Sequence, residues 1–435
     1  MVNEIIKKIK NRDAKVGVVG LGYVGLPLVI EFINAGFNVL GLDIDNEKIT
    51  KLAKGETYIK HISSDLIQGI CDTGRFDGSC DFARSAECDI VILCVPTPLT
   101  QHREPDMSYI VSTAKSLAPY VRKGQFFSLE STTYPGTTTE VLKPILEGET
   151  SLIVGKDFFL AYSPEREDPS NSSFSTSTIP KVVGADDEDS QKIAKAIYDT
   201  VICETILVSS TAIAEATKLV ENIFRSVNIA MVNELKVIFT KMGIDIWEVI
   251  NAAKTKPFGF MPFYPGPGLG GHCIPIDPFY LTWKAREFNE STRFIELAGE
   301  INTQMPYYVV QRTMEAMNDE GIVMNGSRIL LVGLAYKKNV DDVRESPTFK
   351  LWDLYEEKGA VVEYYDPYRP VIPKMREYPH LFGKKSISLE DAKEFDAVVI
   401  STAHDSVDHS AVAQLGKCVI DTRNIIPDFD GVVKA

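Results

Sequence analysis

The feature that most constrains the fold of this chain is a glycine-rich turn set between a strand and a helix. An apolar strand at residues 16–19 leads directly into Gly20-Leu21-Gly22-Tyr23-Val24-Gly25, and an apolar helical segment follows at residues 26–35. In this context Gly20 permits a tight turn, Gly22 lets the backbone approach a pyrophosphate, and Gly25 lets the helix pack closely on the strand. A second strand then ends at Asp43. This order predicts an α/β unit that binds a dinucleotide.

The kind of dinucleotide depends on Asp43. The helix behind the turn offers free N–H groups and the positive end of its dipole to the phosphates, and Tyr23 and Val24 are further expected cofactor contacts within the turn. Asp43 lies eighteen residues after Gly25, where a carboxylate accepts hydrogen bonds from an adenosine ribose. Because the same carboxylate would repel a 2′-phosphate, the sequence predicts NAD rather than NADP.

Three further strands are expected within residues 89–95, 126–133 and 158–166, and each runs into polar, loop-forming residues. Ligands of an open parallel sheet bind outside the carboxyl ends of its strands. We therefore expect Thr97, Thr132 and Glu165 to line one crevice. Taken singly, each of the three is better explained as a turn or cap residue than as a site residue, and it is their common position at strand ends that favours a site.

The middle of the chain is helical by its apolar spacing. Residues 211–242 form one long expected helix, with Thr211 as its N-cap and Gly243 as its stop. Lys218 and Asn222 lie four residues apart and so share a face. The alternative, a solvated polar pair, is disfavoured by the apolar residues around them. A helix of this length would connect two domains and could supply the interface of a homodimer.

A loop rich in glycine and proline comes next, at residues 265–278, and it carries Cys273. So much Gly and Pro excludes a helix or a central strand and allows a close backbone approach. A thiol with a carboxylate, Asp277, four residues on is a candidate for covalent catalysis. The alternative is a structural cysteine, since free cysteines usually behave as small buried hydrophobes.

The last part of the chain repeats the design of the first. A strand at residues 328–332 runs into a turn in which the glycine pattern is reduced to Gly333-Leu334-Ala335-Tyr336-Lys337, and a helix at 347–358 and strands at 361–366, 395–401 and 417–421 come after it. This pattern predicts a nucleotide site that is not a full dinucleotide site. Lys337, Lys338 and Arg344 would supply positive charge to its phosphates.

The length and charge of the chain limit the number of its domains and the kinds of partner it can have. A chain of 435 residues is too long for one core, so we predict an α/β protein in which two Rossmann-like doubly wound domains, residues 1–207 and 321–435, are joined by a long central helix and a helical region, residues 208–320. The net charge of −14 argues against a nucleic-acid partner. No apolar run spans a membrane and no signal core is seen, so we expect a soluble, cytoplasmic protein. The seven cysteines are scattered and the histidines number six, which supports neither disulfides nor a metal site.

Taken as a set, these residues resemble the UDP-sugar 6-dehydrogenases over essentially the whole chain. The resemblance is carried by Gly20 to Gly25, Ser163-Pro164-Glu165, Lys218 with Asn222, Gly270-Gly271-His272-Cys273 with Asp277, and Asp341-Asp342-Val343-Arg344-Glu345-Ser346. The form of the loop around His272 is most similar to the branch that acts on UDP-N-acetylhexosamines, particularly UDP-N-acetylglucosamine. The last domain would then bind the UDP-sugar.

The resemblance implies a mechanism with NAD as the cofactor. The Cys273 thiolate adds to an aldehyde at C6 of the sugar, a second oxidation leaves a thioester, and water releases the uronic acid. By the same resemblance Lys218 and Asp277 stabilise oxyanions and handle protons, and Asn222 is an additional donor. Glu165 orients or deprotonates the hydrolytic water.

Further roles come from the resemblance alone. Cofactor contacts are implied for Thr97, Thr132 and Arg344, and Thr132 would also position the water or the substrate. Substrate contacts are implied for Glu165, Arg166, Lys218, Asn222, Tyr264, Gly268, Gly270 and Lys337. UDP-N-acetylmannosamine, UDP-N-acetylgalactosamine and UDP-glucose remain alternative substrates. Two other classes stay open: a two-electron alcohol or hydroxy-acid dehydrogenase with a structural Cys273, and a noncatalytic nucleotide-sugar sensor.

Overall fold

The computed structural model describes residues 1–59, 62–100, 102–166, 177–271, 274–375, 377–389, 395–414, 416–426 and 431–435. Cys273 and His272 lie outside the described residues. The chain divides into two compact units, Met1–Glu221 with Phe279–Glu290, and Asn222–Pro278 with Ser291–Ala435. Two of the divisions fall inside helices, at residues 221–222 and 278–279, and the third falls between helices, at residues 290–291.

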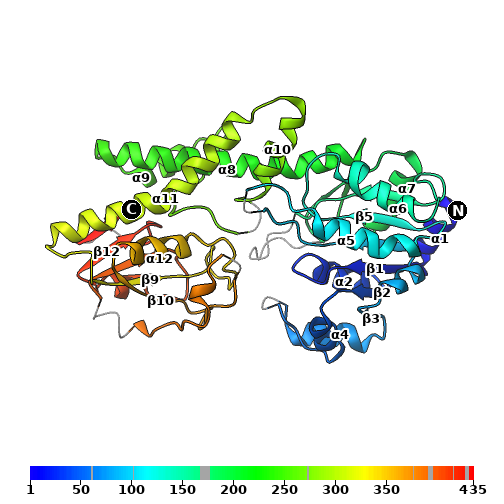
Figure 1. The fold of residues 1–435 in the computed structure, drawn as a ribbon, viewed down its shortest axis with the longest axis horizontal. Coiled ribbons are helices and arrows are strands. Elements are labelled where there is room, and N and C mark those ends of the chain that lie inside the picture. Colours follow the sequence, from blue (N-terminus) through cyan, green and yellow to red (C-terminus); the bar gives the residue numbers. More distant parts are fainter. Residues whose placement is uncertain are drawn as a thin grey trace. The chain divides into compact units, whose positions relative to one another are not determined.

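The first unit alternates strands with helices, as the sequence predicts (Figure 1). Its elements are α1 (Val2–Asn11), β1 (Lys15–Val19), α2 (Gly25–Asn34), β2 (Asn38–Leu42), α3 (Asn46–Ala53), α4 (Ser64–Asp72), β3 (Phe76–Ser79), η1 (Phe82–Glu87), β4 (Ile90–Leu93), α5 (Ser108–Leu117), η2 (Ala118–Tyr120), β5 (Phe126–Leu129), η3 (Thr138–Leu142), α6 (Lys143–Gly148), β6 (Phe159–Tyr162), β7 (Lys181–Gly184), α7 (Glu188–Tyr198) and β8 (Thr205–Val208). A short turn, η4 (Arg286–Phe288), also belongs to it.

The described strands of this unit form one sheet in the order β3-β2-β1-β4-β5-β6-β7-β8. Neighbouring strands are parallel except β6 and β7, which pair antiparallel at Tyr162 and Gly184. Continuous apolar runs such as Ile-Val-Ile-Leu of β4 are buried on both faces, which is typical of a doubly wound sheet. The sequence did not reveal the reversal at β7.

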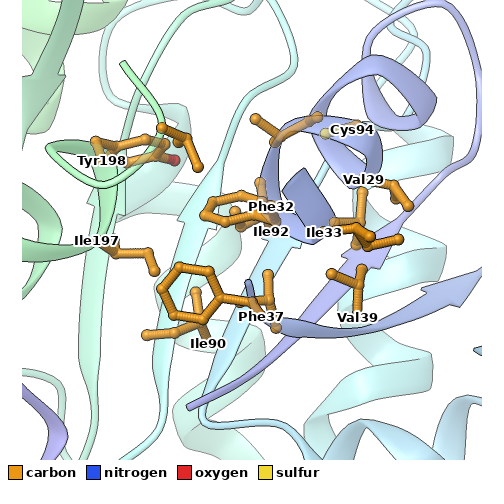
Figure 2. Close-up of a cluster of buried hydrophobic side chains, with 14 of the residues drawn as sticks. Val29, Phe32, Ile33, Phe37, Val39, Ile90, Ile92, Cys94, Ile197 and Tyr198 are labelled. Atoms are coloured by element: carbon orange, nitrogen blue, oxygen red, sulfur yellow. The ribbon is translucent and has the colours of Figure 1, made fainter. Parts of the chain in front are cut away.

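Side chains of each strand alternate between two cores, one on each face of the sheet. On one face Ile90 and Ile92 of β4 pack with α1, α2 and α7, and on the other the intervening residues of β4 pack with α5 and α6. Figure 2 shows the first of these cores, in which the rings of Phe32 and Phe37 meet edge to face with centroids 5.7 Å apart. Helices on both faces fix the sheet and therefore the position of its carboxyl edge.

The second unit holds a smaller parallel sheet, in the order β10-β9-β11-β12-β13 among the described strands. Its elements are α9 (Ile246–Ala253), α11 (Arg293–Asp319), β9 (Arg328–Val332), α12 (Pro347–Glu357), β10 (Val361–Tyr365), η5 (Pro379–Leu381), β11 (Ala397–Ile400), α13 (His409–Ala413), β12 (Cys418–Asp421) and β13 (Val432–Lys434). One core joins this sheet to α11 and α12, and a second lies on the opposite face with α13.

Two helices cross the division between the units. They are α8 (Thr211–Met242), which has the bounds that the sequence predicts, and α10 (Asp277–Ala285). The predicted fold class, two doubly wound α/β sheets with a long central helix, is confirmed. The described helices include none with the length and apolar character that crossing a membrane requires.

Candidate active site

The turn after β1 has the geometry that its glycines predict. Gly20 has a φ of 92°, a left-handed conformation that favours glycine, and its N–H donates to the carbonyl of Leu42 at 2.8 Å. A Cβ on Gly25 would overlap the carbonyl oxygen of Gly20, whereas a Cβ on Gly22 would meet no atom within 4 Å. Helix α2 begins at Gly25, and no side chain caps its first N–H groups. The turn therefore leaves open space over Gly22 and leads into the N-terminal end of α2, whose positive dipole favours phosphate groups.

Asp43 lies at the end of β2, beside this turn. Its side chain is 5% exposed, and its Oδ2 accepts hydrogen bonds from the Leu21 N–H at 2.8 Å and from Lys48 Nζ at 2.9 Å. Oδ1 accepts from the N–H of Asp45 at 2.9 Å. The carboxylate is thus fixed at the expected ribose position, but an ammonium neutralises part of its charge. Lys48 was not predicted from the sequence. The feature that could have indicated it is a lysine five residues after the strand-end aspartate.

The other turn residues also contact the protein itself. Tyr23 and Val24 pack against the first core, so their side chains have a structural role whatever they contribute to cofactor binding. The hydroxyl of Tyr58 donates to the carbonyl of Leu21 at 2.5 Å and braces the turn from a neighbouring loop.

Thr97, Thr132 and Glu165 come after the carboxyl ends of three neighbouring parallel strands, β4, β5 and β6. Thr97 is buried, and its carbonyl accepts a hydrogen bond from the Tyr280 hydroxyl at 2.6 Å. Thr132 is half-buried. The structure thus places all three at the same edge of the sheet, as the parallel topology requires.

Glu165 is held at each of its oxygens. One carboxylate oxygen accepts from the N–H of Arg166 at 2.7 Å, and the other accepts from Lys181 Nζ at 3.4 Å. Its backbone carbonyl accepts from Lys218 Nζ at 2.5 Å, so two predicted catalytic residues are in direct contact. The Arg166 guanidinium is bound to Glu221 at 2.6 Å and to the Pro180 carbonyl at 2.7 Å.

A buried carboxylate on α8, Glu215, anchors the loop after Thr132. It accepts from the N–H of Gly136 at 2.6 Å, and from the N–H and hydroxyl of Thr138 at 2.9 and 2.7 Å. Burial raises the pKa of Glu215 to about 7. This contact ties the strand-end loop to the helix that carries Lys218, one turn further on. Sequence reasoning passed over Glu215 because a single acidic residue in a helix carries no signal of such a partner.

In the second unit, Asn222 and Asp277 are buried together. Asn222 Nδ2 donates to Asp277 Oδ2 at 2.6 Å, and the two residues are 3% and 2% exposed. The polar pair at Lys218 and Asn222 is therefore not a solvated face, since both members are buried and partnered within their own units. Asp277 also opens α10, directly after the loop that contains Cys273.

The described part of the Cys273 loop rests on the segment between β9 and α12. Gly271 N–H donates to the Arg344 carbonyl at 3.0 Å. A Cβ on Gly268, which has a φ of 141°, would lie 3.0 Å from Pro347, and one on Gly270 would lie 2.6 Å from Tyr336. Glycine is thus required at these positions by packing, whether or not the loop also contacts a substrate.

The remaining predicted side chains of the second unit lie nearer the surface. Tyr264 is 43% exposed and stacks on Trp247, with ring centroids 6.0 Å apart. Arg344 binds Asp342, with its closest contact at 2.6 Å, and Lys338 binds Asp405 at 3.2 Å. Lys337 also takes part in an interaction. The charges of Arg344 and Lys338 are partly neutralised within the unit.

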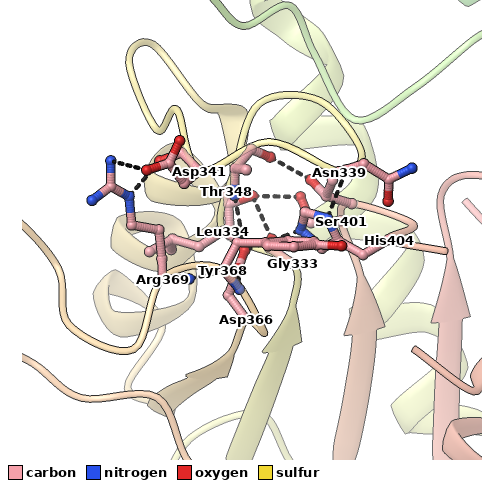
Figure 3. A network of polar contacts seen from close by, with 12 residues as sticks. Gly333, Leu334, Asn339, Asp341, Thr348, Asp366, Tyr368, Arg369, Ser401 and His404 are labelled. Atoms are coloured by element: carbon pink, nitrogen blue, oxygen red, sulfur yellow. Dashed lines mark hydrogen bonds and ion pairs between the residues drawn. The ribbon is translucent and has the colours of Figure 1, made fainter. Parts of the chain in front are cut away.

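The turn after β9 is closed by a polar network around Asp366 (Figure 3). The Asp366 carboxylate accepts from the N–H groups of Leu334 and Ala335 at 2.6 and 3.1 Å, and it pairs with the buried His404 at 3.1 Å. Burial by itself would raise the pKa of Asp366, but the bonds from His404 and from backbone N–H groups hold that pKa below its usual value.

Three side chains of the kinds that can bind a metal ion lie close together elsewhere in this unit: Asp353, Glu356 and His380. His380 Nε2 pairs with Asp353 at 2.9 Å, and Glu356 accepts from the Trp352 indole N–H at 2.7 Å. These contacts account for the group as a hydrogen-bonded surface cluster.

Comparison with known proteins agrees with this layout. The UDP-glucose/GDP-mannose dehydrogenase family matches in three parts: its NAD binding domain over residues 14–202, its central domain over residues 212–304, and its UDP binding domain over residues 330–428. The dinucleotide turn falls in the first part, the polar pairs of α8 in the second, and the Asp366 network in the third.

Similar proteins span almost the whole chain. A UDP-N-acetyl-D-glucosamine 6-dehydrogenase of Pseudomonas aeruginosa is 34% identical over 407 residues, which cover 93% of this chain and 94% of that protein. A UDP-N-acetyl-D-mannosamine dehydrogenase of Methanocaldococcus jannaschii is 32% identical over 426 residues, covering 95% and 92%. A solved structure of UDP-D-ManNAc dehydrogenase from Pyrococcus horikoshii aligns with a TM-score of 0.86 at 32% identity, covering 95% and 96%. The chain therefore belongs to the UDP-glucose/GDP-mannose dehydrogenase family and is an NAD-dependent UDP-sugar dehydrogenase.

Proposed function

We propose that the protein oxidises the C6 hydroxyl of a UDP-N-acetylhexosamine, UDP-N-acetylglucosamine, to the uronic acid in two successive oxidations through Cys273. The contact that supports this most is the buried bond between Asn222 and Asp277, which fixes a carboxylate four residues after the cysteine. The choice of sugar is supported by the His272 form of the loop and by the 34% identity to a UDP-N-acetyl-D-glucosamine 6-dehydrogenase.

The turn at residues 20–25 fits a dinucleotide because it combines open space over Gly22 with the N-terminal end of α2 and its positive dipole. Gly20, Gly22 and Gly25 would hold the pyrophosphate, and Asp43 with Lys48 would lie at the adenosine ribose. The chemistry that NAD supplies is the acceptance of one hydride in each oxidation.

Cys273 carries the sugar between the two oxidations. After the first, its thiolate sulfur bonds to the C6 aldehyde and gives a thiohemiacetal; loss of the second hydride leaves a thioester on the sulfur. Lys218 stabilises the oxygen anions formed at C6, Asp277 exchanges protons at that oxygen, and Asn222 is a further donor. Glu165 accepts the proton of the hydrolytic water, which Thr132 positions.

The stoichiometry of NADH per sugar tests this function. We expect two NADH per UDP-N-acetylglucosamine, and the largest kcat/KM in a panel that also contains UDP-N-acetylmannosamine, UDP-N-acetylgalactosamine and UDP-glucose. One NADH per sugar would make the protein a two-electron dehydrogenase with a structural Cys273, and no NADH would favour a sensor. Cys273→Ser should abolish uronate formation and leave NAD binding intact, because a serine hydroxyl lacks thiolate character; near wild-type turnover would exclude covalent catalysis.

UDP-N-acetylmannosamine is the second candidate substrate, because a relative at 32% identity and the aligned structure at TM-score 0.86 are both named for that activity. A kcat/KM for this epimer above that for UDP-N-acetylglucosamine would assign it instead.

We also propose that the protein forms a homodimer through the central helix. Along α8 a series of large apolar side chains is exposed in the single chain, and a second copy would cover them: Ile213, Val220, Phe224, Met231, Ile238 and Met242. Light scattering at working concentration should give twice the mass of the chain, and Phe224→Glu should lower the measured mass.

The location we propose for the protein is the cytoplasm.

A further inference from the structure

A tightly enclosed charge cluster of the first unit is centred on Lys181. The Lys181 side chain is 4% exposed, and its Nζ donates to Glu130 Oε2 at 2.8 Å and to Glu165 Oε2 at 3.4 Å. The Glu130 side chain is completely buried, and Glu165 is 15% exposed. One ammonium therefore contacts two carboxylates, one inside the core and one at the carboxyl edge of the sheet.

The reversed strand β7 places the lysine there. Because β6 and β7 are antiparallel, with Tyr162 opposite Gly184, continuing the same register sets Lys181 opposite Glu165. The first residue of β7 thus lies at the edge where the parallel strands end. A parallel β7 would have put Lys181 at the opposite edge.

The inner side of the cluster is rigid. The Tyr198 hydroxyl donates to Glu130 Oε1 at 2.6 Å and lies 2.8 Å from the Ser128 hydroxyl, and the ammonium lies 5.5 Å from the centre of the Tyr198 ring. Each oxygen of Glu130 therefore has a fixed donor. The bond at 2.8 Å from Lys181 Nζ to Glu130 Oε2 therefore joins the lysine to a carboxylate that is itself held by Tyr198.

The charges of the cluster are coupled. Burial by itself would lower the pKa of Lys181, but Glu130 and Glu165 more than offset it and raise that pKa, so the amine stays charged. Burial raises the pKa of Glu130, and the charge of Glu165 adds to this while Lys181 opposes it. Other charged or titratable groups that face the cluster are Cys94 after β4, Tyr198 on α7, Arg166, and Lys218 on α8 through the Glu165 carbonyl. Without the ammonium, two carboxyl groups would share one small volume, and one of them would take up a proton.

We propose that Lys181 is a positioning residue for hydrolysis, which keeps the Glu165 carboxylate ionised and fixed in direction so that it can accept a proton from water. This inference rests on the role proposed above for Glu165. In that step the water oxygen bonds to the thioester carbon, the water proton passes to Glu165, and the C–S bonding pair returns to the Cys273 sulfur. Lys181 keeps all of its protons throughout.

The test compares Lys181→Met with the wild-type protein in pre-steady-state experiments with NAD and UDP-N-acetylglucosamine in excess over the enzyme. The substitution keeps an unbranched side chain, one atom shorter than lysine, and removes the charge. We expect hydrolysis to slow by about 10- to 100-fold, so that a burst of NADH approaching two per site precedes slow turnover and the sugar adduct on Cys273 becomes visible by mass spectrometry. The hydrolysis rate falls at acid pH as the carboxylate takes up a proton, and we call this part of the pH profile the acid limb. In Lys181→Met the acid limb should move up by about one pH unit or more, because a carboxyl group without its counter-charge has a higher pKa.

Two variants separate this effect from a general loss of structure. Lys181→Arg restores a cation and should return the acid limb toward its original pH. Lys284→Met removes another buried lysine that bridges two carboxylates, Glu140 and Glu287 at 2.7 Å each, and should leave the limb in place. An equal shift in Lys284→Met would mean that the effect is unspecific, and the proposal would be wrong.

Glu130→Gln gives an opposite expectation and does not depend on whether Lys181→Met folds. It removes the competing carboxylate and keeps the shape, so Lys181 would serve Glu165 alone and the acid limb should move to lower pH. An unchanged or raised limb would contradict the proposal.

Glu165→Gln distinguishes failure of this inference from failure of the proposed function. If Glu165→Gln accumulates the adduct while Lys181→Met neither slows hydrolysis nor shifts its pH dependence, the role of Lys181 is wrong and that of Glu165 stands. If Glu165→Gln is slow from the first hydride transfer and forms no adduct, the role of Glu165 must be withdrawn, and that of Lys181 with it.

Discussion

Both units contain the same strand-turn frame, in which a strand runs into a glycine turn that is bonded to the end of the neighbouring strand. In the first, Gly20 has a φ of 92° and donates its N–H to the end of β2; in the second, Gly333 has a φ of 87° and donates its N–H to the end of β10, each at 2.8 Å. In each unit a strand-end aspartate, Asp43 or Asp366, accepts an N–H from the residue after that glycine. The frame therefore does not by itself decide what is bound.

The two units differ in the segment that comes directly after the turn. In the first unit α2 begins at Gly25, so the N-terminus of the helix faces the turn. In the second, α12 begins only at Pro347, and the intervening segment carries Arg344 and supports the glycines of the Cys273 loop. In the first unit the helix N-terminus thus comes directly after the turn, and in the second the segment before the helix supports a loop. The pairing of the buried lysines differs as well, because Lys181 of the first unit is paired and Lys236 of the second has no hydrogen-bond partner among the described residues.

The largest effect should come from Asp366→Ala. The carboxylate also accepts from the N–H groups of Tyr368 and Arg369 at 2.7 and 2.9 Å, so its loss leaves several buried donors unpaired and should destabilise the second unit by about 3–5 kcal/mol. Hydrogen exchange in β9 and β10 would report this, while β1 and β2 stay protected. Because the pKa of Asp366 is lowered in the folded state, its stabilisation is present above the usual aspartate pKa and is lost as the pH falls below it.

The matched control is Asp405→Ala, since Asp405 is exposed and binds Lys338 and Asn339 at the surface. It should leave exchange unchanged. Equal protection in Asp366→Ala and the wild type would show that this network does not hold the second turn together.

Gly25→Ala should have the next largest effect and should act on the first unit alone. The added Cβ would overlap the Gly20 carbonyl, so the turn and the start of α2 must move apart. We expect the affinity for NAD to fall by about 100-fold or more, because the phosphate donors lose their alignment, while UDP binding by the second unit is kept. Fluorescence or calorimetric titration with each ligand would measure this.

Gly22→Ala sharpens the same test, because its Cβ would meet no protein atom within 4 Å. The fold should be unaffected, so a loss of NAD affinity without a change in Tm would place the pyrophosphate at Gly22. Unchanged affinity would mean that the cofactor does not approach the turn there.

Asp43→Ala should shift the choice of cofactor. It removes a ribose acceptor and also frees Lys48, whose ammonium could then pair with a 2′-phosphate. We expect the ratio of kcat/KM for NAD to that for NADP to fall by about 10- to 100-fold. The double variant Asp43→Ala with Lys48→Ala should lose NADP activity again. A ratio that does not change in Asp43→Ala would show that this carboxylate is not at the ribose.

Much of this architecture could be predicted from local patterns. The bounds of α8 and the positions of β1, β9 and α12 are set by apolar spacing and glycine stops. The cap predicted for α8 was wrong, because Ser210 rather than Thr211 accepts from the N–H of Ile213, at 3.2 Å. The glycines, Asp43 and the strand ends indicated the NAD cofactor, which the family match confirms. These signals are local because turn geometry and helix boundaries depend on a few neighbouring residues.

The contacts that depend on tertiary structure were not visible. Lys181 reaches Glu165 only because β7 runs backwards, and a short apolar strand does not reveal its direction. Glu215 meets a loop about eighty residues away in sequence, with a separation of 79 to Gly136. The roles of Thr132, Arg344 and Cys273 remain predictions, and Cys273 lies outside the described residues.

The smallest effect concerns the unpaired lysine of the second unit. Lys236 is 2% exposed, and its Nζ has no hydrogen-bond partner among the described residues; it lies 5.9 Å from the centre of the Tyr308 ring. Burial, and then the charge of Arg423, lower the pKa of Lys236 to about 7. The folded state therefore binds fewer protons than the unfolded state between about pH 7 and the usual lysine pKa of about 10.4, so this residue makes stability rise with pH across that window.

Lys236→Met should accordingly stabilise the protein at neutral pH by about 1 kcal/mol, because it removes a buried polar group that has no partner among the described residues. It should also flatten the rise in stability above pH 7, which thermal unfolding at several pH values would show. Lys241→Met, on the exposed side of the same helix, is the control and should change neither quantity. Lys181→Met should do the reverse of Lys236→Met and destabilise the first unit, because it leaves the carboxylate of Glu130 buried without its cation. If both variants changed stability in the same direction, the contrast between a paired and an unpaired buried lysine would not hold.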